Sequence, residues 1–174
     1  KYLVVWADYN VTRIFGRFVT DAGAPSGAAF QISEAPAGGL FPAVAYNAAS
    51  DEFLVTWDDF GRRGDVIHGQ RVRAADGTLA GTNFPIGSVS GGIRSAVAWS
   101  PSNNVYLVTY WVGGGPNIEI FGQRVSGNGA LLGGNFNISN DGVFSGYPAV
   151  AWGAASNHFL VSWDNEDGNI HGRR

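Results

Sequence analysis

The strongest constraint on the fold is a repeat, in which four short blocks of sequence recur in a fixed order about every 53 residues. The segment Ala-Val-Ala stands at 43–45, 96–98 and 149–151, so both intervals are 53 residues. An aromatic-Leu-Val-x-aromatic block follows each of these segments and also begins at Tyr2. Blocks of the form Ile-x-Gly and Phe-x-Ile complete the order. Self-similarity on this scale indicates a solenoid, a propeller or another array of similar units.

Each block has the chemistry of a β-strand. Most of its residues are β-branched or aromatic, and turn-forming Gly, Asn, Asp and Ser separate the blocks. No segment keeps a 3.6-residue period over three turns, so we expect essentially no helix. In chain order of the repeat, the blocks occur three, four, four and three times, which predicts 14 strands.

Four-stranded antiparallel units of about this length are typical of β-propeller blades. The sequence therefore predicts an all-β fold, a β-propeller-like array of about 3.5 blades in a single repeat domain, 1–174. We expect a partial blade at 1–33, blades at 41–87 and 94–139, and a partial blade at 147–174. The small Ala-Val-Ala strands suit the crowded centre. Gly69 is expected to let the indole of Trp57 lie flat on the third strand.

Because known propellers have at least four blades, 3.5 blades cannot close a ring. Three interpretations remain open at this point. The sequence is an excerpt of a longer chain, or copies assemble into a homo-oligomeric ring, or the strands form a compact sheet structure that is not a propeller.

Composition excludes several classes of function. The formal net charge is −3, which argues against nucleic acid as a partner. No apolar run approaches 18 residues, so no membrane span is expected. The chain has no Cys, which rules out disulfides and zinc–thiolate sites, and no cofactor motif is present.

The blocks also carry a resemblance. The pattern Val-Ala-Tyr-Asn at 44–47, Phe-Leu-Val-x-Trp at 53–57, Ile-x-Gly-Gln-Arg-Val at 67–72 and Phe-x-Ile-Ser at 136–139 resembles repeats of large secreted or surface-exposed bacterial proteins. The resemblance implies propeller-like repeats and an extracellular or cell-surface location. It implies no particular activity.

Six residues are candidate ligand contacts. Repeated aromatic and guanidinium groups can stack on sugars and bind hydroxyls or carboxylates, and the candidates are Tyr46, Trp99, Trp111, Trp152, Arg71 and Arg124. A structural role competes with this reading. Equivalent aromatic residues can fill gaps between blades, and the Arg residues can pair with Asp residues after the second-strand Trp, such as Asp58.

Metal binding and catalysis find little support. His68 and His171 stand where other repeats have Phe15 and Phe121, which is typical of a packing position rather than a metal site. Asp58, Asp59 and Asp65 crowd one loop, but no nucleophile motif accompanies them. The tripeptide Arg-Gly-Asp at 63–65 matches an adhesion motif by sequence only.

The sequence thus favours a non-catalytic binding module, lectin-like or directed at another cell-surface ligand. The alternatives are a structural repeat protein that assembles into rings or filaments, and a scaffold portion of a larger extracellular protein.

Overall fold

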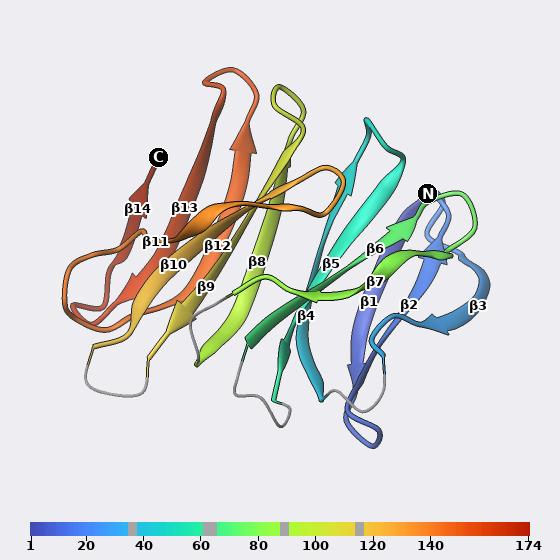
Figure 1. Ribbon diagram of the computed structural model, residues 1–174, viewed down its shortest axis with the longest axis horizontal. Helices are drawn as coiled ribbons and strands as arrows, with labels where there is room; N and C mark the ends of the chain where they lie inside the picture. The colour runs from blue at the N-terminus through green and yellow to red at the C-terminus, as the bar shows by residue number, and fades with distance from the viewer. Residues whose placement is uncertain (35–37, 61–65, 88–90, 114–116) are drawn as a thin grey trace.

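The computed structural model describes residues 1–34, 38–60, 66–87, 91–113 and 117–174. These residues form 14 strands and no helix, arranged in four antiparallel sheets (Figure 1). The prediction of an all-β fold is therefore confirmed. Nowhere in the described ranges is there a helix long and apolar enough to cross a membrane.

The strands of each sheet follow one another in chain order. Sheet 1 contains β1 (Tyr2–Asp8), β2 (Arg13–Val19) and β3 (Pro25–Gln31). Sheet 2 contains β4 (Gly39–Asn47), β5 (Glu52–Asp59), β6 (Val66–Arg73) and β7 (Leu79–Pro85). Sheet 3 contains β8 (Gly92–Ser100), β9 (Val105–Val112), β10 (Glu119–Ser126) and β11 (Leu131–Asn137). Sheet 4 contains β12 (Ser145–Gly153), β13 (His158–Asn165) and β14 (Ile170–Arg173).

The four sheets stand one after another, and each packs a face against its neighbour (Figure 1). The strongest contacts between sheets join β4 to β8 and β8 to β12, which are the Ala-Val-Ala strands. Small side chains at these positions let neighbouring strands approach closely. The first strands therefore line up from sheet to sheet, as the repeat predicts.

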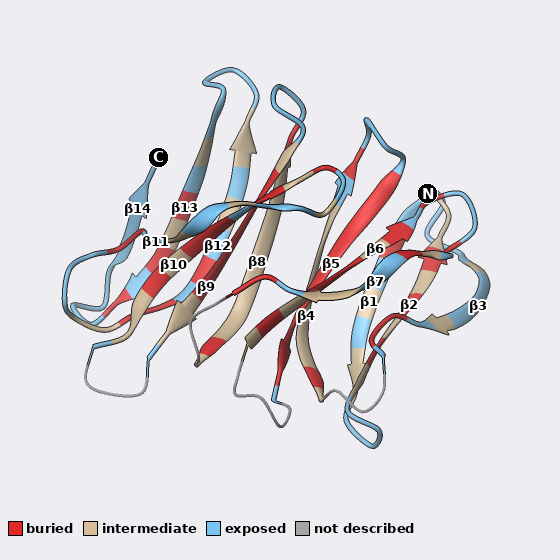
Figure 2. Cartoon of the chain, viewed as in Figure 1, coloured by how far each residue is buried: buried red, intermediate tan, exposed pale blue. Residues whose placement is uncertain are grey.

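Successive side chains along the second strand of a sheet point to opposite faces and fill the interfaces on both sides of that sheet. On β5, Phe53, Val55 and Trp57 join a core with sheet 1, while Leu54 joins a core with sheet 3. A third core lies between sheets 3 and 4. Figure 2 shows the result, since β5 is buried along its length and β14 at the end of the array is exposed.

The repeated Gly of the third strand has a different role from the expected one. A Cβ at Gly69 would lie 2.6 Å from Cδ1 of Ile86 and 3.2 Å from Cζ of Phe84, both from the Phe-x-Ile block. The indole of Trp57 instead stacks on His68, with ring centroids 6.3 Å apart. The expectation that Trp57 covers Gly69 is therefore wrong, and the glycine makes room for the block that follows it in the chain.

We expect Gly69→Ala to lower the free energy of unfolding by about 1–3 kcal/mol, because overpacking displaces buried Ile86. Gly134→Ala is the matched control, since nothing lies within 4 Å of its Cβ position. The control should change stability by less than about 0.5 kcal/mol. Urea unfolding followed by circular dichroism measures both, and equal stability of the two variants would contradict the assignment.

Candidate functional site

Five of the six predicted ligand residues lie at the same end of the sheets, where hairpins join the first and second strands. The strand register places them there: Tyr46 pairs with Phe53, Trp99 with Tyr106, Trp152 with Phe159, Arg71 with Leu54, and Arg124 with Leu107. Trp111 pairs with Ile93 and Ile120 at the opposite end. The residues therefore do not form one site.

A groove of about 450 Å³ lies between sheets 3 and 4 at this hairpin end. It brings together two of the predicted residues, Arg124 and Trp152. Its volume falls within the range of about 300–1,000 Å³ that small-ligand sites occupy. The groove is also lined by Phe136, Phe159, Asn157, Val105, Arg173 and Arg174. The lining carries three guanidinium groups and no carboxylate.

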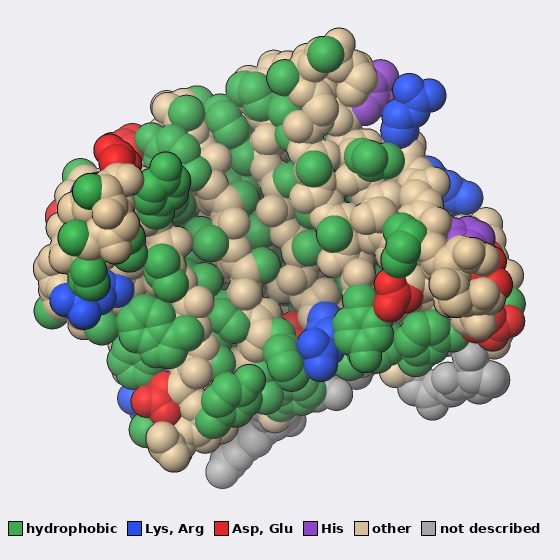
Figure 3. All heavy atoms as spheres, turned by 180° about the vertical axis from the view of Figure 1, so that it is seen from behind, with side chains coloured by type: hydrophobic (Ala, Val, Ile, Leu, Met, Phe, Trp, Pro, Cys, Tyr) green, Lys and Arg blue, Asp and Glu red, His purple; other side chains and the backbone are tan. Residues whose placement is uncertain are grey.

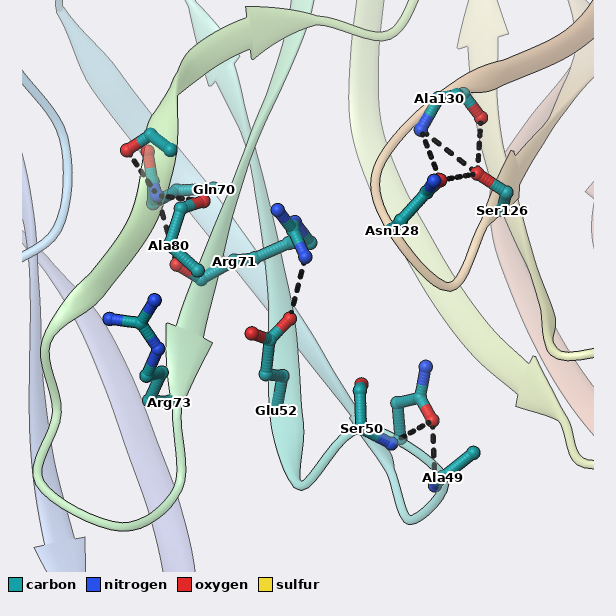
Figure 4. Close-up of polar contacts among 12 residues, drawn as sticks. Ala49, Ser50, Glu52, Gln70, Arg71, Arg73, Ala80, Ser126, Asn128 and Ala130 are labelled. Carbon is teal, nitrogen blue, oxygen red and sulfur yellow. Dashed lines mark hydrogen bonds and ion pairs between the residues drawn. The ribbon is translucent and has the colours of Figure 1, made fainter.

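The two predicted arginines occupy equivalent positions but have different partners. Arg71 donates from Nη1 to Oε2 of Glu52 at 2.8 Å, an ion pair that Figure 4 shows beside the hairpin. The expectation that Arg71 pairs with an Asp after the second-strand Trp is wrong. In sheet 3, Val105 stands where sheet 2 has Glu52. The guanidinium of Arg124 consequently makes no hydrogen bond or ion pair with any described residue, and Arg124 lines the groove without an acidic partner.

Trp99 and Trp152, which are repeat equivalents, differ in the hydrogen bonding of Nε1. Nε1 of Trp99 donates to Oδ1 of Asn104 at 3.0 Å. Nε1 of Trp152 is buried and has no hydrogen-bond partner among the described residues, although the ring packs edge-on against Phe159 at 4.9 Å. Nε1 of Trp57, Trp111 and Trp163 is buried without a partner in the same way, so Trp152 contributes its ring to the groove lining rather than an exposed donor.

Tyr46 is satisfied within its own hairpin. Its hydroxyl donates to Oδ1 of Asp51 at 2.7 Å. This hydrogen bond to the carboxylate, together with partial desolvation and the negative charge, raises the pKa of Tyr46. The ring also packs on Phe53 at 5.0 Å. Tyr46 lines a smaller cavity of about 320 Å³ with Lys1 and Tyr2, away from the groove.

In sheets 2 and 3 the turn between the third and fourth strands packs on the preceding sheet. The turn at Gly77 packs on Phe30 of sheet 1, and the turn at Gly129 packs on Arg71 and Phe84 of sheet 2. Phe136 is the equivalent residue of sheet 3, and it remains exposed at the groove.

Trp111 belongs to a stack that sequence reasoning missed. Its ring stacks on Tyr147 at 5.4 Å, and the guanidinium of Arg94 lies 5.1 Å from Tyr147 and 4.2 Å from Phe41. Phe41, Arg94 and Tyr147 are repeat equivalents, and all three have positive φ, between 49° and 53°, at a bulge of the first strand. Their spacing of 53 residues makes the correspondence visible in the sequence, but the stacking between sheets is not.

His68 and His171 pack against tryptophans, as expected. His171 lies against Trp163 with centroids 6.3 Å apart, as His68 does against Trp57. Asp167 accepts a hydrogen bond from His171, which holds the pKa of Asp167 below its usual value. No group of three or more metal-ligating side chains occurs within the described ranges. The tripeptide at 63–65, and with it Asp65, lies outside the described residues.

On the reverse side of the molecule, hydrophobic side chains are spread widely and most charged side chains lie toward the edges (Figure 3).

Comparison with known proteins finds chains of similar fold at low sequence identity. No protein-family model and no curated protein sequence matches the chain. An N-acetylgalactosamine deacetylase from F. plautii, in complex with blood group B trisaccharide, matches 98% of this chain with a TM-score of 0.60 and 10% identity. A Hadza microbial sialidase matches 93% with a TM-score of 0.54 and 11% identity. The matches cover 64% and 42% of those chains, so this chain spans less than two thirds of either protein.

Proposed function

We propose that the chain is a non-catalytic carbohydrate-binding module, and that its groove binds a glycan bearing carboxylate or sulfate groups. The observation that carries the proposal is the groove itself, in which the Arg124 guanidinium has no acidic partner among the described residues and the Trp152 ring forms part of the lining. Guanidinium groups bind carboxylates and sulfates through paired hydrogen bonds, and aromatic faces pack on the apolar face of a sugar ring. The two structural neighbours act on or bind glycans by name, which supports the same ligand class.

We further propose that the sheets are blades of a propeller-like array and that the module works outside the cell or at its surface. The alignment of β4, β8 and β12 beside one another supports the first point. The resemblance to repeats of secreted and surface-exposed bacterial proteins supports the second. The groove lining contains no carboxylate to serve as an acid or base, which favours binding over glycoside cleavage.

Isothermal titration with sialyllactose and with a heparin-derived tetrasaccharide tests the proposal, and the two probes separate carboxylate from sulfate recognition. We expect one of them to bind and Arg124→Gln to weaken that binding about 10- to 100-fold, the effect of losing a hydrogen bond between charged groups. Arg73→Gln is the matched control, because it removes the same charge from an exposed position on β6. Blood group B trisaccharide serves as the neutral probe.

Failure of both acidic glycans to bind would overturn the proposed function. Equal weakening by Arg124→Gln and Arg73→Gln would show that net charge, and not the groove, governs the binding.

A further inference from the structure

Three bulky residues hold a backbone conformation that such residues rarely adopt. Phe41, Arg94 and Tyr147 have φ of 49°, 53° and 51°, in the left-handed region that glycine occupies without strain. Apart from Thr12, the other non-glycine residues with positive φ in the described ranges are Asp or Asn, which tolerate it better. The strain recurs at one position of three sheets, where glycine would relieve it. The side chains at this position therefore have a role that glycine could not fill.

A bulge in the first strand redirects these side chains and fixes where they start. The strand register shifts at this place in β4, β8 and β12. In β8 the bulge is held by sheet 2, because both carboxylate oxygens of the fully buried Asp58 accept the backbone N–H of Arg94 at 2.9 Å. The hydroxyls of Thr56 and Ser95 are hydrogen-bonded beside it, also at 2.9 Å. The backbone of Arg94 is thus anchored to the preceding sheet.

The guanidinium of Arg94 lies beside aromatic rings from both neighbouring sheets. Strands β4, β8 and β12 lie side by side (Figure 1). Cζ of Arg94 on β8 is 4.2 Å from the ring centroid of Phe41 on β4 and 5.1 Å from that of Tyr147 on β12. Trp111 stacks on Tyr147 at 5.4 Å and extends the row. Since sheet 3 has sheets 2 and 4 on either side, both neighbours of Arg94 are supplied from inside the array.

The N–H groups of this guanidinium are left without acceptors. Arg94 is only partly buried, and its guanidinium makes no hydrogen bond or ion pair with any residue that the structure describes. Asp58 accepts from the backbone of Arg94 and not from its guanidinium. Tyr147 is 50% exposed, so a ligand can reach its ring. A planar fork of N–H donors matches the two oxygens of a carboxylate, and the rings beside it offer apolar surface.

We propose that Phe41, Arg94 and Tyr147 form a second binding site, which takes a carboxylate carried on a six-membered ring, as in a uronic acid. The guanidinium binds the carboxylate, and the two aromatic side chains contact the ring that carries it. The site lies at the end of the sheets opposite to the groove, because Ile93, next to Arg94, pairs with Trp111. It goes beyond the proposed function and does not depend on the groove.

NMR titration with three small ligands tests the site. The ligands are methyl β-glucuronide, cyclohexanecarboxylate and the neutral methyl β-glucoside. The Nε–H signal of Arg94 and the indole signal of Trp111 are the reporters. We expect at least one of the two acids to shift both signals with a dissociation constant in the millimolar range, and the glucoside to leave them unchanged. Preference for the glucuronide or for cyclohexanecarboxylate shows whether the sugar hydroxyls are recognised as well as the carboxylate.

Two substitutions of Arg94 separate the planar fork from the charge. Arg94→Gln should reduce the affinity for the acid at least about 10-fold, read from the Trp111 signal. Arg94→Lys should also weaken binding, because an ammonium keeps the charge but lacks the fork. Arg73→Gln is the control, since it removes a charge from an exposed position on β6 and should bind as the wild-type chain does. Circular dichroism checks that each variant stays folded.

Absence of a response to both acids would overturn the second site, and so would an equal response to methyl β-glucoside. Wild-type affinity in Arg94→Gln or Arg94→Lys, or equal weakening by Arg73→Gln, would overturn it as well. Sialyllactose binding at the groove, read from the Trp152 signal, should persist in Arg94→Gln. Failure of this site and failure of the groove are therefore distinguishable.

Discussion

Trp57→Ala is expected to lower the free energy of unfolding by about 3–5 kcal/mol, the cost of removing a large aromatic side chain from a core. Trp57 is completely buried between sheets 1 and 2 and packs on His68. Small domains are stabilised by only about 5–15 kcal/mol, so the loss removes a large part of the total. Urea denaturation measured by tryptophan fluorescence and by circular dichroism gives the change.

Trp6→Ala is the control built into the repeat. Trp6 occupies the same position one unit earlier and stacks on Phe15 in the same way, but it faces outward. In dilute solution its loss should cost less than about 1 kcal/mol. Similar costs for the two substitutions would contradict the view that packing between sheets, rather than within them, holds the array together.

Val105→Glu is expected to reduce acidic-glycan binding about 10- to 100-fold without unfolding the chain. The substitution reproduces in sheet 3 the pair that Glu52 and Arg71 form in sheet 2 at 2.8 Å. A carboxylate at 105 would occupy the free guanidinium of Arg124 and repel an anionic ligand from the groove. Titration calorimetry at fixed ionic strength measures the affinity.

Val105→Gln controls for size and polarity without the charge. We expect it to retain most of the affinity of the wild-type chain. If Val105→Glu and Val105→Gln bind acidic glycan equally well, Arg124 is not the group that contacts the ligand.

The strands were predictable because the residue types within each block favour a β-strand. The apolar run at Phe53, Leu54 and Val55 is a local property of β5. The same block recurs once in each of the four sheets. The Ala-Val-Ala segments likewise marked the strands that meet between sheets. Local residue chemistry and a fixed period were sufficient for this level of the fold.

The site was predictable only in part, because it arises from differences between repeats. Trp152 and Arg124 were chosen for their residue types, but so were Trp99 and Arg71, which the protein satisfies internally. The signal that separates the arginines is the change from Glu52 to Val105, which has meaning only once β9 and β10 are known to pair. The stack of Phe41, Arg94 and Tyr147 was missed for a similar reason, since the period aligns the three residues but does not show that their side chains meet between sheets.

The role of Gly69 shows a further limit. The sequence indicates that a large group must approach the third strand, but it does not say which one. Trp57 and Phe84 are both candidates, and the register of β6 with β7 decides for Phe84, which pairs directly with Gly69.

Binding of an anionic glycan in the groove between sheets 3 and 4 is tested most directly by the six indole N–H groups. Each Trp gives one resonance in a ¹H–¹⁵N spectrum, and single Trp→Phe variants assign them. During titration with sialyllactose or the heparin tetrasaccharide, we expect a progressive shift of the Trp152 resonance, with those of Trp6, Trp57 and Trp99 nearly unchanged. A spectrum that does not respond, or one in which Trp99 or Trp111 moves while Trp152 stays in place, would contradict it.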